Sequence, residues 1–401
     1  MSTFEFGMPT TLFTISDPKE HSAIKSLFSS YFSRRSVQRL EHMVQGRVDK
    51  LISQLLKNHR ASPVNMNHAY RSVTLDIITL YTLRTSIDAT SFPSFQHPAL
   101  HSIDEALLQT WFFRYFPFLR LTFHLPKWLA ILLSPSSKPM AEMQEDIEKL
   151  VDKALQDYQQ YDPDSDSDLN VFYTLLSNSR VEGKVRQSHR VTREWLIAEG
   201  VALRVAGSDT VGNACTIGTR CLMRDSRVRQ KLVDELETAW PDKGLSMPLE
   251  RLEKLPYLTA VIKESLRLSH GTVTPMSRVV SESGAVISGH PVPPGTIVSI
   301  ASPFIDMNPD IFVDPTSFYP ERWIEDKENT LNHYLVTFGK GPRSCLGINL
   351  AWSELYMILG NVFRKLDFHS DGDLQSEVDF GEFFVPLYKG DALSATVSER
   401  A

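Results

Sequence analysis

The chain contains little cysteine: Cys215, Cys221 and Cys345 are the only three in 401 residues. An odd and widely spaced set of this kind excludes the disulfide framework of a small secreted protein. It indicates a protein that works inside the cell or facing the cytosol. An excess of basic residues is also absent, because the net charge is −6 and no long run of like charge occurs. Composition therefore does not point to nucleic acid as a partner.

Long apolar runs are missing as well. No stretch of about 18 uncharged apolar residues predicts a membrane-spanning helix, and the first residues, MSTFEFGMPTTLF, lack the basic and apolar regions of a signal peptide. The nearest approach is residues 110–133, an aromatic-rich segment that basic residues and two prolines interrupt. This segment is either a core helix with a loop, or a segment that rests on a membrane surface or lines an apolar channel.

Helical periodicity dominates the first two thirds of the chain. Helices are predicted, in chain order, over residues 20–32, 36–58, 64–83, 138–158, 192–223, 225–240, 258–268 and 348–364. The longest of them, 192–223, carries few charges, so we expect it to cross the interior. The sequence also predicts short strands over 277–302, an irregular stretch over 303–337 and a short hairpin from about Asp379. The acidic segment 161–170 predicts a polar loop.

A glycine-rich loop, FGKGPRSCLG, places Cys345 directly before the last predicted helix. The N-terminus of a helix lowers the pKa of a nearby thiol and supplies free N–H donors. The glycines Gly339, Gly341 and Gly347 allow positive φ and a close approach of the backbone to a flat cofactor. For a lone cysteine the alternative is a buried structural residue in a glycine-rich turn.

The loop also fits the pattern F-x-x-G-x-R-x-C-x-G, with Phe338, Gly341, Arg343, Cys345 and Gly347 at its fixed positions. This pattern resembles the signature of the cytochrome P-450 superfamily, the haem-thiolate monooxygenases, and the resemblance extends over nearly the whole chain. It implies a haem b cofactor whose iron takes Cys345 as its axial thiolate ligand. It also implies that Arg343 pairs with a haem propionate, and that Phe338, Gly341 and Gly347 shape the cofactor loop.

Two further motifs follow the order found in that family. KESLR places Glu264 and Arg267 on one face of a helix, and FYPERW contributes Arg322. The resemblance implies that these three residues form a buried network that braces the haem loop. Removing one partner of such a network strongly destabilises a protein, even where the intact network contributes little to its stability. We therefore interpret the three residues as structural supports and not as catalytic residues.

The segment AGSDT, residues 206–210, interrupts the long apolar helix with small and hydroxyl-bearing residues, which weaken a helix locally. An ordinary kink is one interpretation of this segment. The resemblance implies another, in which Thr210 delivers a proton to dioxygen and Asp209 supplies protons from solvent. Such delivery is the work of a general acid.

Weaker matches suggest further contacts with the haem propionates, from His21 and Lys25 in HSAIK and from Arg278. The family usually has arginine where Lys25 stands, and lysine keeps the charge but loses the bidentate fork. The H-x-N-P motif of the family reads DMNP at 306–309, so that Asp306 replaces a histidine. A salt-bridge role at this position is one interpretation.

The spacing also predicts what precedes the first motif. His21 lies 324 residues before Cys345, an interval that resembles the membrane-bound eukaryotic members of the family, yet only 20 residues precede His21. We therefore expect a single mainly α domain with a small β part over residues 1–401, a cytochrome P-450 fold without the membrane anchor, the first helix, much of the first sheet and a recognition loop. A truncated gene product or isoform, an inactive product, and a chain that still binds haem beside an open pocket all remain open.

The region from Tyr334 to Phe368 looks most like fungal members of the family, those similar to trichodiene oxygenase. This resemblance implies hydroxylation or epoxidation of an apolar small molecule in secondary metabolism, such as terpenoid biosynthesis. It also implies electrons from an NADPH-dependent flavoprotein reductase that docks near Lys340 and Arg343. The expected location is the cytosolic face of the endoplasmic reticulum membrane, or a peripheral or cytoplasmic one without an anchor. The alternatives are a haem-binding protein with little or no turnover, and a helical scaffold whose motifs are accidental.

Overall fold

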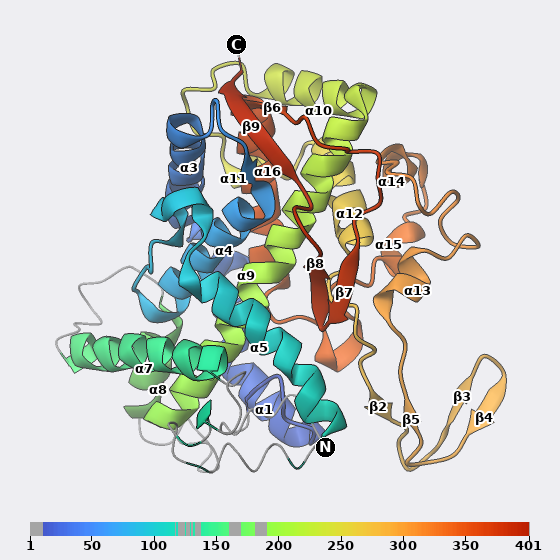
Figure 1. The fold of residues 1–401 in the computed structure, drawn as a ribbon. Helices are drawn as coiled ribbons and strands as arrows, with labels where there is room; N and C mark the ends of the chain where they lie inside the picture. Colours follow the sequence, from blue (N-terminus) through green and yellow to red (C-terminus); the bar gives the residue numbers. More distant parts are fainter. Residues whose placement is uncertain are drawn as a thin grey trace.

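A long helix runs through the middle of the molecule, and shorter helices and small sheets surround it (Figure 1). The computed structural model describes residues 11–116, 138–159, 170–180 and 191–400, with a few isolated positions between 117 and 137. Half of the aromatic-rich segment 110–133 and nearly all of the loop predicted at 161–170 lie outside the described residues.

The periodicity of the sequence predicts the positions of the larger helices, except for the two at Pro98–Tyr115 and Val171–Arg180, which were not predicted. The larger helices are α1 (Pro18–Ser29), α3 (Glu41–Asn58), α4 (Met66–Leu83), α5 (Pro98–Tyr115), α7 (Lys138–Gln159), α8 (Val171–Arg180), α9 (Arg193–Arg224), α10 (Ser226–Ala239), α12 (Pro256–Ser269) and α16 (Ile348–Lys365). The predictions for 36–58 and 64–83 were wrong in detail. A turn at Arg39 and Leu40 separates a short α2 (Arg34–Gln38) from α3, because Leu40 is buried in the core. Asn65 caps the N-terminus of α4 with its side chain.

Short helices replace part of the irregular stretch that the sequence predicts over 303–337. They are α13 (Ser302–Asp306), α14 (Glu321–Glu325) and α15 (Leu331–Tyr334), and elsewhere α11 (Leu249–Leu252). Single 3-10 turns are η1 (Ala89–Ser91), η2 (Pro93–Phe95) and η5 (Gly341–Arg343). Prolines at the first positions of α13 and η5 start these turns, since their fixed φ suits a helix and their missing N–H is not needed there.

The strands form small antiparallel sheets. They are β1 (Val64–Asn65), β2 (Arg278–Val279), β3 (Ala285–Ile287), β4 (His290–Val292), β5 (Ile297–Val298), β6 (Leu366–His369), β7 (Phe380–Phe383), β8 (Val385–Tyr388) and β9 (Ser394–Glu399). The order β1-β9-β6 makes a three-stranded sheet, while β2 pairs with β5, β3 with β4 and β7 with β8. The β7–β8 hairpin lies beside α9, and β2 to β5 form an arm that projects from the body (Figure 1). The prediction of a mainly α fold with a small β part is therefore confirmed.

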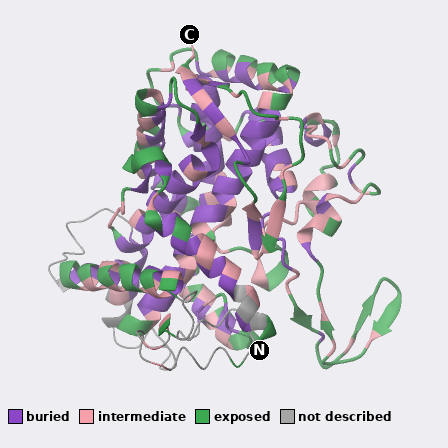
Figure 2. Cartoon of the chain, viewed as in Figure 1, coloured by how far each residue is buried: buried purple, intermediate pink, exposed green. Residues whose placement is uncertain are grey.

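Helix α9 is buried along most of its length, as its low charge predicts (Figure 2). The Thr192 side chain accepts a hydrogen bond from the backbone N–H of Trp195 and so caps the N-terminus of α9. Two glycines let α9 lie close to α4: a Cβ at Gly207 would lie 2.6 Å from Ile78 Cγ1, and one at Gly212 would lie 2.6 Å from Arg71 Cγ. No helix among the described residues combines the length and the apolar character that crossing a membrane would need.

We expect replacement of Gly207 by alanine to destabilise the fold by about 1–3 kcal/mol, because the added methyl group collides with buried Ile78. Gly46 supplies a matched control, since it also lies inside a helix but a Cβ there meets nothing within 4 Å. Gly46→Ala should stabilise the protein by about 0.5–1 kcal/mol through helix propensity. Chemical denaturation of both variants measures the two effects, and a Gly207→Ala protein as stable as Gly46→Ala would contradict the close contact of α4 with α9.

Candidate active site

The loop before α16 holds Cys345 in a fixed turn. The Cys345 N–H donates to the carbonyl of Phe338 over 2.8 Å, which closes the loop. Gly339 and Gly341 adopt φ of +65° and +76°, in the left-handed region that side chains other than glycine rarely occupy. The Gly347 N–H donates to the thiol of Cys345. The glycines of the motif thus place free backbone and one sulfur atom on the same side of the turn.

The Cys345 thiol is accessible to solvent, whereas Cys215 and Cys221 are buried. The surrounding protein desolvates the Cys345 thiol and raises its pKa, although the Gly347 N–H and the charge of Lys25 act in the opposite direction. A thiol in this state is protonated near neutral pH until a metal ion displaces the proton. Cys345 is therefore the cysteine, among the three, that a ligand can reach.

Basic side chains gather around the same loop. Lys25 of α1 donates from Nζ to the carbonyls of Pro342 and Ser344, both over 2.9 Å. Lysine thus clamps the backbone of the loop at the position where the family usually has arginine. Arg343 donates to the carbonyl of Ser16 over 3.2 Å. Among the described residues, neither of these two cations forms an ion pair with a carboxylate.

Further basic side chains add to the positive charge at this loop. Arg278 of β2 is exposed, and its charge, together with burial as the larger cause, lowers the pKa of the Arg343 guanidinium. His21 of α1 has a lowered pKa, first because it is partly desolvated and then because Arg343 and Lys25 are near. Three cations, Lys25, Arg278 and Arg343, which form no ion pair with a carboxylate among the described residues, make a site that favours an anionic ligand.

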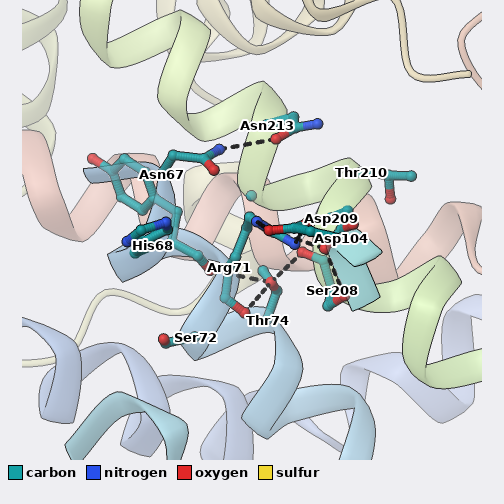
Figure 3. A network of polar contacts seen from close by, with 12 residues as sticks. Asn67, His68, Arg71, Ser72, Thr74, Asp104, Ser208, Asp209, Thr210 and Asn213 are labelled. Carbon is teal, nitrogen blue, oxygen red and sulfur yellow. Dashed lines mark hydrogen bonds and ion pairs between the residues drawn. The ribbon is translucent and has the colours of Figure 1, made fainter. Parts of the chain in front are cut away.

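The AGSDT segment of α9 directs the side chains of Thr210 and Asp209 to different sides of the helix. Thr210 and Ala206 have solvent access in a helix that is otherwise largely buried, and the Thr210 hydroxyl donates to the Ala206 carbonyl over 3.1 Å. Asp209 leaves the helix in another direction, toward α4 (Figure 3). Its Oδ1 accepts from Arg71 Nε over 2.9 Å and from the Ser208 hydroxyl over 2.9 Å. The structure therefore places the Asp209 carboxyl in the interior and not at the solvent-exposed surface.

Glu264 and Arg267 of α12 and Arg322 of α14 come together in a buried network. The Glu264 carboxylate, fully buried, accepts from Arg267 over 2.7 and 3.0 Å and from Arg322 over 3.1 Å. It also accepts from the indole N–H of Trp323 over 2.9 Å and from the Tyr319 N–H over 3.0 Å. Every donor of this set faces one carboxylate, so the network depends on Glu264.

The same network holds the chain that leads to the cysteine loop. Arg267 donates to the carbonyls of Asp306, Pro315 and Ser317. The Thr337 hydroxyl, one residue before Phe338, donates to the Leu266 carbonyl over 3.1 Å. A Cβ at Gly271 would lie 2.6 Å from Thr337 Cγ2, so the glycine allows this contact between α12 and the loop. The three predicted supports thus lie next to the cysteine loop in space.

Asp306 has a partner of its own. Its Oδ2 lies 3.2 Å from Nδ1 of His270, the residue that ends α12. Burial raises the pKa of Asp306, and the hydrogen bond and charge of His270 oppose that rise. The aspartate that replaces the histidine of the H-x-N-P motif therefore contacts a histidine elsewhere, and this contact is an ion pair whenever His270 is protonated.

Sequence reasoning missed Arg71 of α4 and Asp104 of α5. Arg71 lies between Asp104 and Asp209 and pairs with both (Figure 3). The one signal in the sequence was an arginine in the apolar run from Tyr70 to Leu83, where a charge needs a partner. Its two partners lie 33 and 138 residues away, so spacing alone does not identify them.

The donor set fits a haem group. One accessible thiol lies in a loop that backbone glycines keep open, and the uncompensated cations Lys25, Arg278 and Arg343 suit two propionates. The fold and the site together define the class of the protein: a mainly helical oxidoreductase with a candidate haem-thiolate centre between α9 and α16.

The chain belongs to the cytochrome P450 family, whose family model matches residues 4–389. It is 32% identical over 369 residues to cytochrome P450 monooxygenase flvC of Aspergillus flavus, covering 91% of this chain and 67% of that protein. It is 30% identical over 400 residues to conidiogenone synthase PchP450 of Penicillium rubens, covering 98% and 78%. The crystal structure of the cytochrome P450DA haem domain shares its fold, with a TM-score of 0.79 at 18% identity over 100% of this chain and 82% of that chain.

The protein is thus a cytochrome P450 monooxygenase, and the fold predicted from the motifs is confirmed. Membership of the family implies haem as the cofactor and a redox partner as the source of electrons. The roles of the individual site residues stay predictions.

Proposed function

We propose that the protein hydroxylates or epoxidises an apolar small molecule in fungal secondary metabolism, such as terpenoid biosynthesis. The observation that carries the proposal is the cysteine loop, where an exposed cysteine lies among cations that pair with no carboxylate in the described part of the chain. Similarity to fungal monooxygenases and to a protein named conidiogenone synthase supports the substrate class.

Each site residue has a part in this proposal. Cys345 would hold haem b through its thiolate, and bound haem would supply the activation of dioxygen. Arg343, Arg278, Lys25 and His21 hold the propionates, while Phe338, Gly341 and Gly347 shape the loop. Thr210 presents its hydroxyl on the solvent-accessible side of α9, and Asp209 supplies the proton that the hydroxyl passes on. Glu264, Arg267 and Arg322 support the loop from α12 and α14.

The proposal extends to partners and location. An NADPH-dependent flavoprotein reductase would supply two electrons at the face of Cys345, where Lys340 is exposed and donates only to the Asn332 carbonyl among the described residues. We also propose the cytosolic face of the endoplasmic reticulum membrane as the location, with peripheral membrane contact.

We propose that residues 1–401 form a single domain. One apolar core that includes residues from Ile15 to Val397 supports this proposal.

The test begins with the spectrum of the reduced protein under carbon monoxide. Thiolate-ligated haem and product formation with a reductase, measured on a panel of terpenoids, support the proposal. A thiolate spectrum without product from any substrate would instead favour the alternative of a haem-binding protein with little or no turnover. Purified protein that takes up no haem would overturn both.

Thr210→Ala is expected to uncouple the reaction. Without the hydroxyl, NADPH oxidation continues but most electrons leave as hydrogen peroxide, so product per NADPH falls by about 10-fold or more. Thr210→Ser keeps a hydroxyl at the same position and should retain most of the coupling. Equal coupling in the wild type and Thr210→Ala would show that Thr210 has no such role.

A further inference from the structure

Arg71 binds its two carboxylate partners unequally (Figure 3). Toward Asp104 of α5 it makes two parallel hydrogen bonds, Nη2 to Oδ1 over 2.5 Å and Nη1 to Oδ2 over 3.1 Å. Toward Asp209 of α9 it makes one, Nε to Oδ1 over 2.9 Å. A bidentate fork is the stronger arrangement. Asp104 is therefore the main counter-ion of Arg71.

The two oxygens of the Asp209 carboxyl differ. Oδ1 accepts from Arg71 Nε and from the Ser208 hydroxyl, whereas Oδ2 is buried and has no hydrogen-bond partner among the residues that the structure describes. A buried carboxylate oxygen without a donor is costly, and a proton on it removes the charge. One cation with two carboxylates has no net charge only when one carboxylate is protonated, and Oδ2 is the free position.

We propose that Asp104 acts as the counter-ion of Arg71 and thereby leaves Asp209 as a neutral acid with its proton on Oδ2. The inference rests on the proposed function, in which Asp209 supplies protons next to Thr210. In the ionised form of Asp209, the Nε–H of Arg71 and the Ser208 hydroxyl face Oδ1 and stabilise the carboxylate. Asp104 is a positioning residue, because it acts on Asp209 through Arg71.

Two further titratable groups among the described residues interact with this cluster, His68 and Tyr388. His68 of α4 has a pKa lowered by burial and then by Arg71, and Tyr388 of β8 has a pKa raised by burial, so both are neutral near pH 7. Burial and the charge of Asp104 raise the pKa of Asp209, and Arg71 lowers it. Arg71 and Asp104 are thus the two charges that decide the state of Asp209, and they act in opposite directions.

Infrared spectroscopy tests this directly on the purified protein with isotope-labelled aspartate. The carbonyl stretch of a protonated carboxyl should be present in the wild type at neutral pH and absent in Asp209→Asn. Asp104→Asn should lower the pH midpoint of this band by about 1–3 units, because Arg71 then stabilises the Asp209 carboxylate alone. Arg71→Gln should move the midpoint upward, and Asp104→Glu should restore the wild-type value.

The outcomes separate the inference from the proposed function. A wild-type protein without an Asp209-dependent band at neutral pH, or an unchanged midpoint in Asp104→Asn, overturns the inference. Should Asp104→Asn fail to fold, the opposite shift in Arg71→Gln and the retained band in Asp104→Glu decide the same question. The carbon monoxide spectrum reports separately on haem, so a failure of the proposed function is seen without reference to Asp104.

Discussion

Replacement of Cys345 by alanine is expected to abolish the Soret band that thiolate-ligated haem gives in the reduced carbon monoxide complex. Among the three cysteines Cys345 alone is accessible, and it lies where Lys25 and Arg343 leave positive charge without a carboxylate partner. Without the sulfur, the loop has no ligand that donates electron density to the iron. Monooxygenase turnover should fall to the limit of detection, while the far-UV circular dichroism of the protein stays unchanged.

Cys221→Ala is the matched control, since it removes a cysteine that is buried in α9 and has a raised pKa of about 12. This variant should keep the thiolate spectrum and lose only some stability, because a small buried side chain is removed. A haem-loaded Cys345→Ala protein that still shows the thiolate band would disprove the assignment. Loss of the band in both variants would point to general loss of the fold and not to loss of a ligand.

Replacement of Glu264 by glutamine is expected to lower the free energy of unfolding by about 3–5 kcal/mol. Glutamine has nearly the same size, but it leaves the buried guanidinium groups of Arg267 and Arg322 without their counter-charge. It also loses acceptor capacity that the carboxylate offers to Trp323 and Tyr319. We expect haem retention to fall with stability, since Leu266 and Thr337 connect this network to the cysteine loop.

Glu250 offers a control on the surface. It forms an ion pair with Lys254 over 2.8 Å, but the side chains of Glu250 and Lys254 are 70% and 69% exposed. Because solvent screens such pairs, Glu250→Gln should change stability by less than about 0.5 kcal/mol. Chemical denaturation measures the free energy of unfolding of Glu264→Gln and Glu250→Gln. Similar small effects in both would show that the buried network contributes little to the fold.

Much of the fold could be predicted from local pattern. The helix predicted over 192–223 is α9, and the strands predicted over 277–302 are β2 to β5, because apolar period and turn residues are local properties. The turn at Arg39 and the short helices between 303 and 337 were not predictable in this way. They depend on which face of the chain the core covers, and on backbone contacts such as those of Arg267.

In the candidate site, too, the local geometry could be predicted from the sequence, whereas the long-range contacts could not. The motif around Cys345 carries its geometry within ten residues, as the Cys345–Phe338 hydrogen bond and the positive φ of Gly339 and Gly341 show. The AGSDT motif predicts that Asp209 matters, but it does not predict the direction of its side chain. That direction follows from Arg71, which is 138 residues away along the chain.

By itself, the sequence determined the mainly helical architecture and the cysteine loop, because helical period, glycine position and the identity of the one loop cysteine are written in neighbouring residues. The tertiary structure alone decided which charges meet. It brought Lys25 to the cysteine loop, His270 to Asp306, and Arg71 between Asp104 and Asp209. The physical reason is that a buried charge requires a partner but does not specify where along the chain that partner lies, and only the packing of the helices settles it.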